Sequence, residues 1–124
     1  MLYERILVGT DGSATAAVAV DRAVALAAST RAELTIMTVG IGPKAQQVVD
    51  SAAEAHAGAG ISIVPEVRSG DPASTLVEAA QSEGYDLLVV GNKGMTGAAR
   101  FFLGSVPNKV SHHARCSLLI VRTT

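Results

Sequence analysis

The sequence has no tryptophan, one cysteine (Cys116) and no strong excess of either charge. A single cysteine excludes an internal disulfide, which agrees with a reducing compartment. Because 10 Lys and Arg stand against 11 Asp and Glu, the formal net charge is only −1. This balance gives no general electrostatic reason to bind nucleic acid or a membrane surface. A small ligand or a protein partner is therefore favoured.

Long apolar runs are also missing. No run approaches the roughly 20 residues that cross a bilayer, and residues 1–5 lack a secretory layout. We therefore expect a cytoplasmic protein. What the chain does have is 48% hydrophobic residues in 124 positions, enough for a single domain over residues 1–124 with a substantial core.

The sequence contains neither of two common nucleotide-binding motifs, and its histidines do not indicate a metal site. Neither a Gly-x4-Gly-Lys-Ser/Thr loop nor a Gly-x-Gly-x2-Gly segment after the first apolar run occurs. His112 and His113 are adjacent in an expected helix, and neighbours at i and i+1 do not face one metal ion. His56 is expected to be a partly exposed structural histidine. We predict no metal site and assign no catalytic residue.

Short apolar runs alternate with stretches of helical periodicity. The runs cover residues 5–10, 33–39, 61–67, 87–90 and 118–121. The helical stripes, many of them alanine-rich, cover residues 13–27, 44–57, 73–80 and 105–114. Continuous apolar strands that alternate with helices imply a parallel sheet covered on both faces through right-handed crossovers. The sequence therefore predicts an α/β, doubly wound, five-stranded parallel sheet.

Pro65 indicates where the third strand lies in that sheet. It lies within the run 61–67 and has no backbone N–H to donate, so it is tolerated mainly at a sheet edge. We therefore expect the third strand to be outermost.

A glycine-rich segment follows the run 87–90 directly. It reads Gly91-Asn92-Lys93-Gly94 and is completed further on by Gly104-Ser105. Glycines at this spacing let the backbone bend and let a bulky anion approach without meeting a Cβ. Ser105 opens a helical pattern, where free N–H groups and the helix dipole favour negative charge. The segment suits a phosphate chain, although the same residues also fit plain turns and a plain helix cap.

The spacing Gly-x2-Gly-x9-Gly-Ser resembles the nucleotide-binding signature of the universal stress protein family. The resemblance extends to both ends of the chain, through Ile6-Leu7-Val8-Gly9-Thr10-Asp11-Gly12-Ser13 and Ser117-Leu118-Leu119-Ile120-Val121-Arg122. It implies a Rossmann-like, adenine nucleotide alpha hydrolase-like fold with strand order 3-2-1-4-5. In such sheets ligands bind outside the carboxyl ends of the strands, at the point where the strand order switches.

The resemblance also implies roles for individual residues. Asp11 would contact the ribose or base of an adenine nucleotide, Thr10 would line the pocket, and the backbone of Val39 would contact adenine. The strand end and the phosphate loop would contribute Val90, Gly91, Lys93, Gly94, Gly104, Ser105 and Val106. From the residues alone, Asp11 fits equally well as a turn former that caps the first helix. Val39 can be a core residue at the same time, and a loop lysine such as Lys93 is usually just solvated.

ATP is the usual ligand of this family, and Mg2+ can accompany it. AMP and cyclic AMP are alternatives, because the stretch Leu103-Gly104-Ser105-Val106-Pro107 with Val110-Ser111 also resembles an actinobacterial branch that binds cyclic AMP. The implied function is nucleotide-dependent regulation in a stress response. A slow ATPase is a second hypothesis, but Asp11 is the only carboxylate expected near the site, so efficient turnover is not expected. A nucleotide-independent interaction subunit is a third, weakened by the retained glycine signature.

The last strand generates a prediction about association. Its residues Leu118, Leu119, Ile120 and Val121 would form an unguarded apolar edge, which invites pairing with another chain. The simplest closed arrangement is a two-fold dimer, which the family commonly forms through this strand. We predict a homodimer in analytical ultracentrifugation or sizing experiments, and a monomer at micromolar concentration would contradict this.

Overall fold

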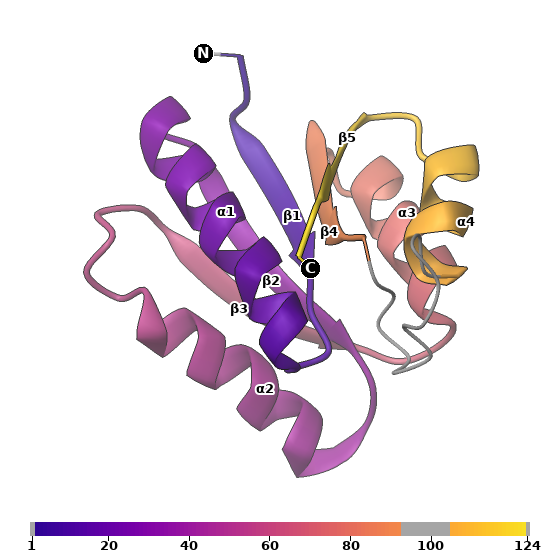
Figure 1. The fold of residues 1–124 in the computed structure, drawn as a ribbon, viewed down its shortest axis with the longest axis horizontal. Helices are drawn as coiled ribbons and strands as arrows, with labels where there is room; N and C mark the ends of the chain where they lie inside the picture. The colour runs from indigo at the N-terminus through magenta and orange to yellow at the C-terminus, as the bar shows by residue number, and fades with distance from the viewer. Residues whose placement is uncertain (1, 93–104, 124) are drawn as a thin grey trace.

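A computed structural model of the chain describes residues 2–92 and 105–123, in which strands and helices alternate (Figure 1). The strands are β1 (Arg5–Gly9), β2 (Glu33–Val39), β3 (Ile63–Arg68), β4 (Leu87–Gly91) and β5 (Ser117–Val121). The helices are α1 (Ala14–Thr30), α2 (Gly42–Ala55), α3 (Pro72–Ser82) and α4 (Ser105–His113). Each predicted strand and helix is found among them, with small shifts at the ends.

The strands form one sheet in the order β3-β2-β1-β4-β5, and each neighbouring pair is parallel. The predicted doubly wound fold and its strand order are therefore confirmed. β1 lies in the middle, where Val8 is opposite Ile36 of β2 on one side and Val89 of β4 on the other. The strand order switches direction at this point, between β1 and β4.

Helices cover both faces of the sheet. Figure 1 shows α1 and α2 on one side of the strands and α3 and α4 on the other. Successive residues of β1 divide between these layers, because Ile6 and Val8 pack in the cluster of α1 and α2, whereas Leu7 packs in the cluster of α3 and α4. Side chains alternate along a strand, so a strand buried on both faces is apolar at most positions.

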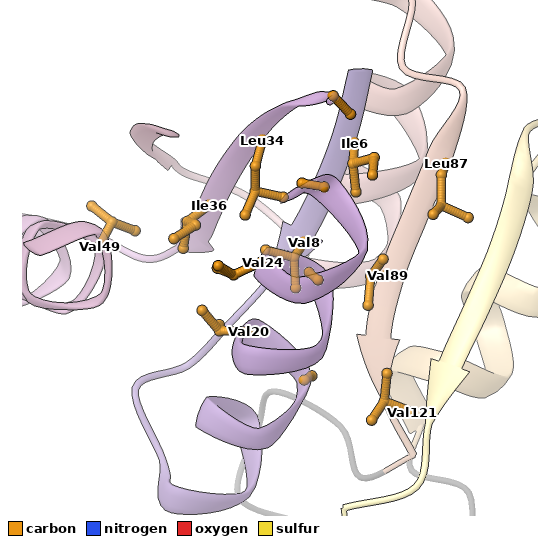
Figure 2. Packing of buried hydrophobic residues seen from close by; sticks show 14 residues of the cluster. Ile6, Val8, Val20, Val24, Leu34, Ile36, Val49, Leu87, Val89 and Val121 are labelled. Carbon is orange, nitrogen blue, oxygen red and sulfur yellow. The ribbon is translucent and has the colours of Figure 1, made fainter. Parts of the chain in front are cut away.

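The core under α1 shows why this helix is rich in alanine. Its buried alanines, all 0% exposed, are Ala19, Ala23 and Ala27. These small side chains let the helix lie close to the sheet, while Val20 and Val24 reach toward Val8 (Figure 2). Val49 of α2 lies over Ile36 in the same cluster.

β3 is an edge strand, as Pro65 predicted. The carbonyl of Ser62 accepts a hydrogen bond from Leu34 N at 2.9 Å, and the carbonyl of Arg68 accepts one from Gly40 N at 2.8 Å. Backbone groups alternate sides along a strand, so the even-numbered residues face β2 and the nitrogen of Pro65 faces the open side. No ladder hydrogen bond is lost there.

Charged groups also guard this edge. Arg68 Nη2 lies 2.6 Å from Glu66 Oε2, and Arg68 Nη1 lies 2.7 Å from Glu83 Oε2. The hydrogen bonds from Arg68 hold the pKa of Glu83 below its ordinary value. At the opposite edge, β5 presents Leu118, Leu119 and Ile120, which are half-buried. Edge strands with charge resist pairing with other chains, whereas apolar ones invite it.

A buried pair of hydroxyl groups yields a test of the packing. Tyr85 Oη donates to Thr35 Oγ1 at 2.8 Å, and these residues are 5% and 1% exposed. We predict that Tyr85→Phe and Thr35→Val each lower the free energy of unfolding by about 1–3 kcal/mol, because each leaves a buried polar group without its partner. The double variant, which removes both groups, should cost less than the sum. Urea denaturation measures this, and strictly additive losses would contradict the coupling.

Candidate functional site

Three neighbouring strands bring the predicted site residues to one edge of the sheet. β1, β2 and β4 end there at Gly9, Val39 and Gly91. The backbone ladder extends one residue past β1, where Thr10 N donates to Met37 O at 2.9 Å. Parallel strands present their carboxyl ends on the same side, so Thr10, Val39 and Gly91 lie on adjacent strands next to the switch point.

The segment after β1 is a hydrogen-bonded turn. Thr10 Oγ1 accepts from Gly12 N at 3.1 Å, and Asp11 Oδ1 accepts from Ser13 N at 2.8 Å. Ser13 Oγ in turn accepts from Ala16 N at 3.2 Å, which makes Ser13 the N-cap of α1. Asp11 therefore forms the turn, as its plain interpretation predicted, but it does not cap the helix. Its carboxylate remains partly exposed at the sheet edge.

Helix α2 lies directly against this turn. Gly12 has φ +82°, and a Cβ built on it would be 2.9 Å from Val48 Cγ2. The close approach follows from the short connection after β2, because α2 begins at Gly42, three residues after Val39 ends the strand. Glycine at position 12 thus serves both the left-handed backbone and the helix contact.

A cleft of about 400 Å³ runs between α1 and α2 from the turn. Thr10, Gly12 and Ser13 line one end, and Asp21 and His56 line the other. Its apolar wall includes Val20, Val48 and Ala52. Val39 and Gly91 do not line it, so the cleft leads away from the sheet edge along the α1 and α2 face.

Helix α4 begins at Ser105, as the sequence predicted. Its first turn has no acidic side chain, and the free N–H groups at a helix start favour anions. The helix is tied to α3, because Gln81 Nε2 donates to the carbonyl of His113 at 3.2 Å. Asp71 caps α3, and hydrogen bonds from Ser74 hold the pKa of Asp71 below its ordinary value.

The predicted site residues differ in exposure. Thr10 and Val90 are each 2% exposed, while Asp11, Val39 and Gly91 are half-buried. Ser105 and Val106 are helical, and only their backbone is described. The remaining predicted contacts, Lys93, Gly94 and Gly104, lie outside the described residues.

Two polar contacts of the fold were not predicted from the sequence, and the first lies beside the site. Asn92 Oδ1 accepts from Thr123 N at 2.8 Å and from Thr123 Oγ1 at 2.9 Å, although 31 positions separate the two residues. The one available signal was the place of Asn92 inside the glycine motif.

The second contact lies at the far end of the cleft. His56 Nε2 is 2.9 Å from Asp21 Oδ1, and the imidazole side chain is 23% exposed, as expected of a partly exposed structural histidine. Within residues 2–92 and 105–123, no cluster of three or more His, Cys, Asp or Glu side chains could hold a metal ion. Nor does any helix of those ranges combine the length and hydrophobicity needed to cross a bilayer.

Comparison with known sequences gives a consistent match. The sequence model of the Universal stress protein family matches residues 2–46 and 41–122. Universal stress protein Rv1636 of Mycobacterium tuberculosis is 34% identical over 144 residues, covering 98% of this chain and 98% of that protein. Universal stress protein YxiE of Bacillus subtilis is 30% identical over 148 residues, covering 98% of this chain and all of its own (100%).

The fold matches solved structures as well. A crystal structure of a universal stress protein in complex with cAMP superposes with a TM-score of 0.87 at 38% sequence identity, covering 100% of both chains. The crystal structure of Rv1636 from Mycobacterium tuberculosis superposes with a TM-score of 0.71 at 38% identity, covering 100% of this chain and 98% of that one.

The contact between Gly12 and Val48 yields a prediction with a matched control. Gly12→Ala forces a left-handed alanine and a clash with Val48, whereas Gly42→Ala meets the same backbone strain at φ +85° with nothing within 4 Å. We predict that Gly42→Ala lowers the free energy of unfolding by about 1 kcal/mol, and Gly12→Ala by clearly more. Adding Val48→Ala should recover part of the Gly12→Ala loss but none of the Gly42→Ala loss. Equal losses for both glycines in urea denaturation would contradict the contact.

Proposed function

The chain belongs to the universal stress protein family, and on this premise we propose that it is a regulatory protein that binds an adenine nucleotide at the switch point between β1 and β4. The observation that carries the proposal is the meeting of three strand ends at one edge of the sheet, with the turn at Asp11 on one side of the switch and Gly91 on the other. Doubly wound sheets bind ligands at this place.

The side chains and backbone groups at this edge suit the parts of a nucleotide. One carboxylate oxygen of Asp11 accepts a hydrogen bond from Ser13 N, so the second oxygen can accept from a ribose hydroxyl or the adenine amino group. Val39 ends β2 beside the turn and offers backbone groups to adenine. Gly91 lets an anion approach the backbone closely, and the start of α4 favours phosphate through its free N–H groups.

The choice of nucleotide is a further part of the proposal. A relative 38% identical over the full chain was solved with cAMP, which favours cyclic AMP as the first ligand to test. ATP, with Mg2+ as its companion, and AMP are the alternatives. Cyclic AMP carries a single phosphate charge, so it needs less cationic compensation than a triphosphate. The stress-response role, the pairing of two copies through β5 and a cytoplasmic location belong to the same proposal.

The test compares two aspartates. Titration calorimetry with cyclic AMP, AMP and ATP should show saturable binding to the wild type, and native mass spectrometry should detect the bound species. We predict that Asp11→Ala weakens binding about tenfold or more, since it removes hydrogen bonds to a charged acceptor, each worth about 1.5–3 kcal/mol. Asp50→Ala removes the same charge from the exposed face of α2, where Asp50 accepts from Gln46 Nε2, and should leave the affinity unchanged.

A third variant separates the turn from the ligand. Asp11→Asn keeps an oxygen that can accept from Ser13 N, so it preserves the turn while it removes the charge. An affinity between those of the wild type and Asp11→Ala is expected. A wild type that binds none of the three nucleotides, or an Asp11→Ala variant that binds as well as the wild type, would contradict the proposal.

A further inference from the structure

The segment that follows β4 is held to the segment that follows β5. Gly91 and Val121 are opposite each other in the sheet, and Asn92 N donates to Val121 O at 2.8 Å. The side chain of Asn92 then turns to the other chain segment, where its Oδ1 accepts from both Thr123 N (2.8 Å) and Thr123 Oγ1 (2.9 Å). We call these three hydrogen bonds the Asn92–Thr123 latch.

The latch is placed where it can matter for a ligand. Asn92 is the second residue of the glycine motif and the first residue beyond β4. Its bonds to Thr123 are part-buried, and hydrogen bonds shielded from water contribute more than exposed ones. One oxygen that accepts two donors from a single residue fixes both the direction of the Asn92 side chain and its distance from Thr123.

We propose that Asn92 and Thr123 are positioning residues for the nucleotide site, an inference that rests on the proposed function. The latch fixes Asn92, next to Gly91 of the proposed site, before the ligand arrives. Without the two bonds that Thr123 donates, the Asn92 side chain and the backbone beside Gly91 are less restrained, so more conformational entropy is lost at the moment of binding and is subtracted from the affinity. Thr123 therefore raises nucleotide affinity through Asn92.

A purely structural role makes a different prediction. If the latch only ended the sheet, its loss would lower the stability of the free protein and leave the affinity for nucleotide unchanged. A positioning role also works in reverse, because coupling between two binding events is reciprocal. Bound nucleotide should then slow the hydrogen exchange of the Thr123 amide, which donates to Asn92 Oδ1, more than it slows exchange of amides elsewhere.

The experiment removes one hydroxyl and uses a matched threonine as control. Thr123→Val keeps the shape and the backbone donor but deletes the Oγ1 hydrogen bond, while Thr123→Ser retains it. In the control, Thr30→Val deletes a hydroxyl that donates to Leu26 O at 3.0 Å in the last turn of α1. Thr30 lies near the amino ends of the strands, away from the proposed site. Titration calorimetry with cyclic AMP, AMP and ATP measures affinity, and thermal melting without ligand measures stability.

We expect Thr123→Val to weaken nucleotide binding about three- to tenfold, the range of one net hydrogen bond. Thr123→Ser should restore wild-type affinity, and Thr30→Val should lower the melting temperature without changing affinity. Asn92→Ala should weaken binding as well, and adding Thr123→Val to it should cost nothing more, since the partner oxygen is already gone.

The outcomes separate this inference from the proposed function. A wild type that binds none of cyclic AMP, AMP and ATP overturns both. A wild type that binds while Thr123→Val binds equally well, or while the Asn92→Ala and Thr123→Val losses simply add, overturns the positioning role and leaves the nucleotide site standing.

Discussion

The arrangement of residues at the carboxyl ends of the strands depends on the hydrogen bonds that β1 makes to a parallel strand on each side. β1 has β2 on one side and β4 on the other, and its residues from Ile6 to Val8 are 0% exposed. The helix that follows β1 is α1, on one face of the sheet, whereas the helix that follows β4 is α4, on the other face. The helices that follow β1 and β4 therefore lie on opposite faces of the sheet. The polar turn and the start of the glycine motif lie on the two sides of this switch point.

Both sides of the switch point are held by contacts that include residues distant in the sequence. On the β1 side, α2 packs Val48 against Gly12, and Ser13 caps α1. On the β4 side, Thr123 bonds to Asn92 after the ladder with β5 has ended. If the site binds a small ligand as proposed, these contacts favour affinity without touching the ligand, because walls that are fixed in advance lose less conformational entropy on binding.

The two edges of the sheet are built for different surroundings. β3 turns the nitrogen of Pro65 outward and places Arg68 between Glu66 and Glu83, so another strand would meet a missing donor and charged side chains. β5 has half-buried leucine and isoleucine side chains instead. Because β5 also adjoins the latch, any partner that paired with it would lie close to the start of the glycine motif.

The sequence by itself determined the elements, their parallel arrangement and the edge position of β3, because strand alternation, helical stripes, caps and proline are local signals. The order of the strands came from the resemblance to the family. The sequence also located Asp11, Val39 and Gly91 at strand ends, which share one edge in any sheet of this order. Only the tertiary structure decided which distant residues meet: Gly12 with Val48, His56 with Asp21, Tyr85 with Thr35 and Asn92 with Thr123. Such contacts depend on the length and angle of the crossovers, and no periodicity along the chain encodes those.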